Sequence, residues 1–153
     1  MWEPLKRYNA LDGEARRMFW RAVALLPMVR ISLRSRGYKK TQEWLERRLE
    51  EGGTPERAGD RAASIEKTCR MVRAAAHYGI GNSSCLDESL VLWWLLRKAG
   101  VVASLRIGVR KEKQEFAAHA WVEHEGVALN QKEDMHRHYA AFDREFTPPA
   151  GQP

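Results

Sequence analysis

A cysteine stands where a helix is expected to begin. Ser84 and Asp87 have the spacing of a capping box, so Cys85 between them should occupy the first turn of the helix. The positive end of a helix dipole favours negative charge, and the thiolate is the form in which a cysteine attacks. Free backbone N–H groups in the same turn can also stabilise an oxyanion. This position therefore predicts a nucleophile.

A histidine follows in a strand-like run of small residues. His119 lies between Ala118 and Ala120, which leave room for a group to approach its ring. A cysteine at a helix start and a histidine on a later strand follow the papain-like order, in which the imidazole deprotonates the thiol. Either residue alone would more often be a buried structural group. Together they favour catalysis by Cys85 and His119, whereas Cys69, in the middle of an apolar helical stripe, is expected to be inert.

A third residue should hold the imidazole, and Asn130 is our choice. A hairpin turn at 124–125 would place Asn130 directly opposite His119, and a turn at 125–126 would place it diagonally on the same face. A three-residue turn would bring Gln131 opposite instead. An asparagine can accept the N–H of the ring, as in Cys-His-Asn peptidases. We therefore predict Asn130 as the orienting residue.

The remaining histidines do not suggest a metal site. His136 and His138 are two residues apart, and the chain has neither a CxxC nor an HExxH motif. We expect no metal and no cofactor.

The 153-residue chain carries a net charge of +6, with arginine concentrated in its first half. No nucleic-acid motif or basic–aromatic platform accompanies these arginines, so solvated helix faces explain the charge and we expect no nucleic-acid partner. The N-terminus has no apolar secretory segment, and no stretch is apolar enough to span a membrane. We expect a cytoplasmic protein with reduced thiols.

Helical periodicity precedes strand-like alternation along the chain. We expect Pro27 to kink or split the first helix and Thr41 to cap the second. Glu125-Gly126 is a plausible hairpin tip. Helices are predicted over 14–34, 40–50, 61–77 and from 85 to Gly100, strands over 101–110, 115–125 and 127–130, and a short helix or strand over 136–146.

This order predicts an α+β fold, in which N-terminal helices precede a nucleophile-bearing helix and an antiparallel sheet. We divide the chain into an N-terminal helical region (1–56), a peptidase core (57–147) and a disordered tail (148–153). Residues 14–34 are apolar on more than one side. They either pack on the domain or dock a partner or a membrane surface.

Three segments of the C-terminal half resemble one known family. They are Cys85–Gly100, Leu105–Arg110 and Ala118–Glu123, followed by Gly126 and Asn130. In this order they resemble the leader peptidase of lasso-peptide biosynthesis, the stand-alone protease half of a maturation protein. The resemblance covers about residues 80–146 and implies a papain/transglutaminase-like fold. The arginine-rich N-terminal region is similar more loosely.

The resemblance implies a cysteine peptidase that removes the leader from a ribosomally made precursor peptide. It further implies a separate leader-recognition protein and a lasso cyclase as partners, with Cys85 as nucleophile and His119 as base. The family commonly has an aspartate just after the hairpin, whereas this chain has Asn130-Gln131 and its next acids are Glu133 and Asp134. The third catalytic position therefore stays open between Asn130, Gln131 and Asp134. Acyl transfer by the same dyad and a non-catalytic peptide-binding module are the alternative functions.

Overall fold

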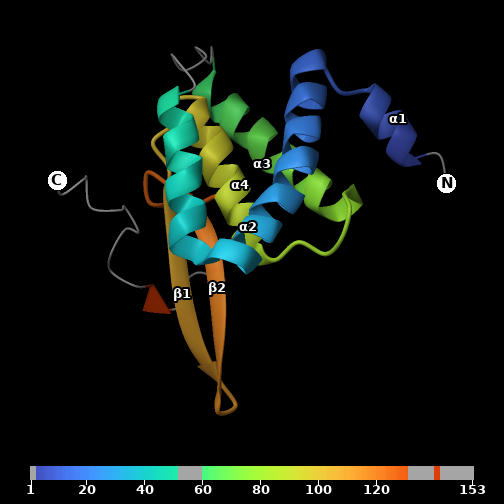
Figure 1. Cartoon of the computed structure of the whole chain (residues 1–153). Helices are drawn as coiled ribbons and strands as arrows, with labels where there is room; N and C mark the ends of the chain where they lie inside the picture. The colour runs from blue at the N-terminus through green and yellow to red at the C-terminus, as the bar shows by residue number, and fades with distance from the viewer. Residues whose placement is uncertain (1–2, 52–59, 131–139, 142–153) are drawn as a thin grey trace.

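The computed structural model describes residues 3–51, 60–130 and 140–141. Helices come first along the chain and an antiparallel sheet follows, which confirms the predicted α+β fold (Figure 1). The helices are α1 (Glu3–Asn9), α2 (Gly13–Glu51), α3 (Arg61–Tyr78) and α4 (Cys85–Lys98), and the strands are β1 (Ser104–Glu112), β2 (Glu115–His124), β3 (Val127–Ala128) and β4 (Ala140–Ala141). The predicted tail, 148–153, lies outside the described residues.

Helix α2 bends at Gly37 and is not split at Pro27. Gly37 has φ 80° and ψ 175°, a conformation that a residue without Cβ adopts at little cost. The two halves of α2 then run alongside α4 (Figure 1). Thr41 does not cap a second helix, because its hydroxyl lies within the helix and donates to the carbonyl of Gly37 at 2.8 Å. The helix therefore breaks at Gly37, between the two helices predicted over 14–34 and 40–50, and it is not split at Pro27.

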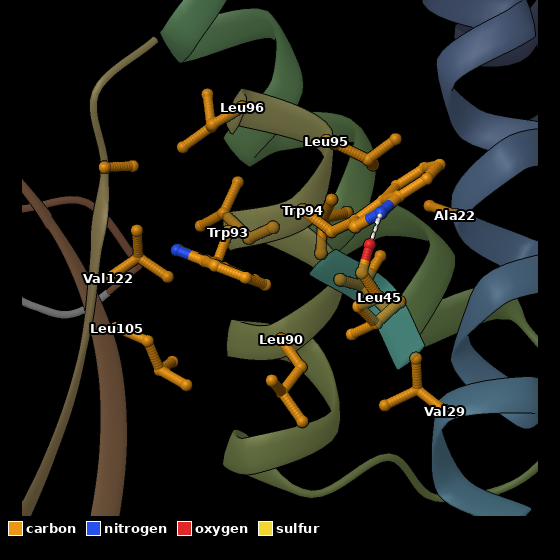
Figure 2. Close-up of a cluster of buried hydrophobic side chains, with 14 of the residues drawn as sticks. Ala22, Val29, Leu45, Leu90, Trp93, Trp94, Leu95, Leu96, Leu105 and Val122 are labelled. Atoms are coloured by element: carbon orange, nitrogen blue, oxygen red, sulfur yellow. Dashed lines mark hydrogen bonds between the residues drawn. The ribbon is translucent and has the colours of Figure 1, made fainter. Parts of the chain in front are cut away.

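Helix α4 forms the centre of the hydrophobic core. Residues 90–96 are all buried, so this helix contacts neighbours on every side. Both halves of α2 and the sheet pack against it, and the indole N–H of Trp94 donates to the carbonyl of Leu45 at 2.9 Å (Figure 2). Burying one such side chain contributes about 1.5–3 kcal/mol. Residues before and after the undescribed segment 52–59 thus belong to one hydrophobic core. The boundary that we predicted at residue 56, between the N-terminal helical region and the peptidase core, falls within that segment.

The sheet has the order β3-β2-β1-β4, with β1 and β2 forming a long antiparallel hairpin (Figure 1). Strand β2 pairs with β3 through His124 and Val127, so the turn consists of Glu125 and Gly126. Both turn residues have positive φ, 50° and 78°, as a tight two-residue hairpin of this type requires. This register confirms the 125–126 turn and places Asn130 diagonally from His119. Strand β4 shows that part of 136–146 is extended.

Candidate active site

Cys85 is the first residue of α4, and the predicted capping box is present. The backbone N–H of Asp87 donates to the Ser84 hydroxyl at 3.2 Å, and the backbone N–H of Ser84 donates to the Asp87 carboxylate at 2.8 Å. Asp87 is buried, which fixes the direction in which the helix begins. The thiol of Cys85 is free and partly exposed. Local sequence therefore places a reachable thiol in the first turn of a buried helix.

The same turn supplies hydrogen-bond donors for an anion. Asp87 N–H is used by the cap, and Glu88 N–H donates to the Ser84 carbonyl at 3.1 Å. Within the described part of the chain, the N–H groups of Cys85 and Leu86 are the remaining donors of this first turn. Donors next to a nucleophile can stabilise the oxyanion that forms when the nucleophile attacks a carbonyl.

His119 lies on β2 with a glycine, Gly108, as its cross-strand partner. The imidazole stacks on Trp121, with ring centroids 6.1 Å apart and an interplanar angle of 21°. Trp121 is held in turn, because its indole N–H donates to the Glu123 carboxylate at 2.9 Å and that carboxylate pairs with Arg106 at 3.1 Å. Partial burial lowers the pKa of His119 from its ordinary value of 6.5. The neutral imidazole, which can accept a proton, is therefore favoured near neutral pH.

A buried hydrogen bond joins the helix of Cys85 to the strand of His119. The hydroxyl of Ser89 donates to the carbonyl of Ala120 at 3.0 Å. Ser89 lies one turn after Cys85 on the same face of α4, and Ala120 directly follows His119. This bond therefore links α4, one turn after Cys85, to the backbone next to His119. Ser89 was not predicted, although a small polar residue four positions after Cys85 in an apolar helix was a usable signal.

Asn130 binds the same two elements, α4 and β2. Its side-chain carbonyl accepts the backbone N–H of Val122 at 2.9 Å, and its amide donates to the Ser89 hydroxyl at 2.8 Å. The bond that we predicted, from the His119 ring to Asn130, is neither of these two. Asn130 thus acts as a clamp between α4 and β2, and its catalytic role stays a prediction. Gln131 and Asp134 lie outside the described residues.

Cys69 differs from Cys85 in its surroundings. It lies within α3 and packs against the hydrophobic core. Burial raises the pKa of the Cys69 thiol to about 11. Because the thiolate is the reactive form, we expect this cysteine to react slowly near neutral pH.

A polar cavity of about 540 Å³ lies between α3 and the start of α4. Arg73 and His77 line its α3 side, and Ser83 and Glu88 line the side next to Cys85. The Ser83 hydroxyl donates to the Glu88 carboxylate at 3.0 Å, while partial burial raises the pKa of Glu88. The cavity thus offers both hydrogen-bond donors and acceptors near the start of α4, and Cys85 is not one of its lining residues.

No cluster of three or more His, Cys, Asp or Glu side chains suited to a metal occurs in the described ranges. His136 and His138 fall outside them. None of the helices described is long and apolar enough to cross a membrane.

Comparison with known proteins gives one family. The model of the transglutaminase-like superfamily matches residues 25–143, which include Cys85, His119 and Asn130. No curated protein and no solved structure matches the chain.

Proposed function

Since the chain belongs to the transglutaminase-like superfamily, whose members typically act as cysteine proteases or acyltransferases, we propose that it is a cysteine peptidase with Cys85 as nucleophile and His119 as base. The observation that carries this proposal is the Ser89–Ala120 hydrogen bond. It fixes the cysteine-bearing end of α4 to the strand of His119. A free thiol at a capped helix start and a histidine with a lowered pKa then suit the two roles.

The reaction proceeds through an acyl-enzyme. The imidazole of His119 takes the thiol proton, and the sulfur of Cys85 attacks the scissile carbonyl carbon. The N–H groups of Cys85 and Leu86 stabilise the resulting oxyanion. The imidazolium returns its proton to the leaving amine as the C–N bond breaks. Water, deprotonated by the same imidazole, then cleaves the thioester and restores the thiol.

The substrate in this proposal is the precursor of a lasso peptide, cut between leader and core. A separate recognition protein presents the leader, and a lasso cyclase acts on the released core. The sequence resemblance supports this assignment. An exposed apolar stripe on α2 supports partner docking, because Trp20, Met28 and Ile31 keep 57%, 46% and 66% of their surfaces exposed.

Acyl transfer to an amine is the second candidate, since the superfamily also includes that reaction type. The same thioester would then be opened by an amine instead of water. A non-catalytic peptide-binding module is the third possibility.

One experiment separates these functions. The full chain is incubated with the precursor peptide and the recognition protein encoded beside it, and the products are identified by mass spectrometry. Hydrolysis yields two fragments whose combined mass exceeds that of the precursor by one water, whereas transfer yields an adduct with the amine. Cys85→Ala should lose product formation by about 10⁴-fold or more, while Cys69→Ala should retain it. Wild-type protein without either product, or an active Cys85→Ala variant, would refute the peptidase assignment.

A further inference from the structure

An apolar groove of about 630 Å³ lies between α1, α2 and α3, apart from the polar cavity beside Cys85. Its walls combine aromatic and aliphatic side chains from all three helices. They include Tyr8, Leu11, Phe19, Met71, Ala74 and Tyr78. A groove of this size can enclose one or two large side chains of another polypeptide.

Specific contacts hold α1 in place and so maintain the groove. The indole N–H of Trp20 donates to the Tyr8 hydroxyl at 2.8 Å, and Tyr8 packs edge-on against Phe19 with centroids 6.1 Å apart. The guanidinium of Arg16 lies 5.3 Å from the Tyr8 ring centroid and donates to the carbonyl of Asn9 at 2.8 Å. The C-terminal end of the short helix is thus fixed to α2, and the groove is present without a bound partner.

The charged side chains that line the groove are Arg7 and Arg70, and both are exposed. Two acidic groups close to the groove along the chain, Asp12 and Glu14, pair with Lys67 at 3.1 and 2.9 Å. Arg70 also lowers the pKa of Asp12, behind the larger effects of the Ala15 N–H and of Lys67. An apolar groove with two arginines at its rim complements a segment that carries acidic residues next to an apolar anchor.

We propose that this groove binds an acidic segment with an aromatic or branched aliphatic anchor, supplied by the separate recognition protein. This inference rests on the proposed function, because it assigns a docking site to the partner that the function requires. The anchor enters between Phe19 and Met71, and the acidic residues pair with Arg7 and Arg70.

The position of the groove explains how a docked partner can deliver a substrate. Met71, Ala74 and Tyr78 line the groove on one side of α3, whereas Arg73 and His77 line the polar cavity on another. A helix with side chains is about 10 Å wide, so the groove and the polar cavity at the start of α4 are roughly one helix apart. In this proposal, a partner seated in the groove presents the bound leader toward the start of α4.

The test compares two groove variants with two matched controls on α3. Ala74→Trp fills the groove, and Arg70→Glu reverses a rim charge. Ala62→Trp and Arg61→Glu make the same changes at exposed positions elsewhere on the helix. Binding of the recognition protein encoded beside the precursor gene is measured by titration calorimetry on the full chain. Circular dichroism and the rate of Cys85 alkylation by iodoacetamide verify the fold and the active site.

Both groove variants should weaken Kd at least tenfold, and both controls should match the wild type. A small aromatic anion, 8-anilinonaphthalene-1-sulfonate, should bind the wild type with enhanced fluorescence and lose that signal in Ala74→Trp. Unchanged Kd in the groove variants, or no binding of the recognition protein to the wild type, would overturn the inference. Groove-dependent binding of the precursor alone, of anionic phosphatidylserine vesicles or of a second copy would overturn our choice of occupant.

These outcomes are distinct from failure of the peptidase function. Cleavage that persists in Cys85→Ala would refute the catalytic assignment, yet the Kd values would still show whether the groove binds the recognition protein. Conversely, a normal nucleophile with unchanged Kd in the groove variants would refute only the docking site.

Discussion

The side-chain amide of Asn130 donates to the Ser89 hydroxyl at 2.8 Å, and that hydroxyl donates in turn to the Ala120 carbonyl at 3.0 Å. Ser89 lies one turn after Cys85, and Ala120 follows His119. The bonds therefore form a partly buried bridge between α4 and β2, next to the backbone of His119.

Replacing Ser89 with alanine should weaken both folding and turnover. The change removes the donor to Ala120 and leaves a buried carbonyl without this partner, which costs about 1–3 kcal/mol in the free energy of unfolding. Turnover should fall because α4 is no longer fixed in register with β2. Urea unfolding and cleavage rates measure the two effects. Ser35→Ala, at an exposed position on α2, is the control and should change neither.

Asn130→Asp distinguishes the two roles of Asn130, which are the observed link between α4 and β2 and the predicted orientation of the His119 ring. A carboxylate still accepts the Val122 N–H and can accept a hydrogen bond from the imidazole N–H, but it cannot donate to Ser89. The free energy of unfolding should therefore fall by about 1–3 kcal/mol. Turnover, measured well below the unfolding transition, should stay substantial, whereas Asn130→Ala should lower it by roughly 10- to 10³-fold.

Gln131→Ala tests whether the strand pairing brings residue 130, and not residue 131, to the face of His119. With the two-residue turn at Glu125-Gly126, the period of two along a strand predicts that residue 131 does not share the face of His119, so the change should be nearly silent. If Gln131→Ala abolishes turnover while Asn130→Ala does not, the orienting residue is not Asn130.

Local signals in the sequence predicted much of the fold. The Ser84–Asp87 box marked the start of α4, and the Glu125-Gly126 tip was one of the turns we weighed. Both depend on residues a few positions apart, which is the range over which caps and tight turns are determined. The α+β class followed from the change in hydrophobic period along the chain.

Contacts between distant residues explain what the sequence did not reveal. The Asn130 amide binds Ser89, 41 residues earlier, and nothing in the local pattern indicates that choice over His119. Pro27, at which we expected a kink or a split, lies inside the helix for a similar reason. Leu26 and Val29 are buried on either side of Pro27, so packing keeps this stretch helical despite the missing N–H.

The two cysteines should differ sharply in reactivity. At pH 7.5, iodoacetamide should alkylate Cys85 and leave Cys69 unmodified, because burial raises the pKa of Cys69 to about 11. Peptide mapping by mass spectrometry assigns the modified residue. Unfolding in urea should make both thiols reactive, which shows that the fold protects Cys69. Preferential modification of Cys69 in the folded chain would contradict the assignment of the nucleophile.

The alkylation rate of Cys85 should report the titration of His119. Burial lowers the pKa of His119 below 6.5, so the neutral ring that accepts the thiol proton persists to lower pH than in an exposed histidine. The acid limb of the rate profile should therefore have its midpoint below pH 6.5.

The lowered pKa of His119 should also make the stability of the fold depend on pH. As pH falls below 6.5, the unfolded chain binds this proton before the folded chain does, so the free energy of unfolding should decrease through that window. His119→Gln removes the titrating ring, and both effects should disappear together. The alkylation rate of this variant should instead rise through the alkaline range, as for an unassisted thiol. An acid limb that survives in His119→Gln would show that another group activates Cys85.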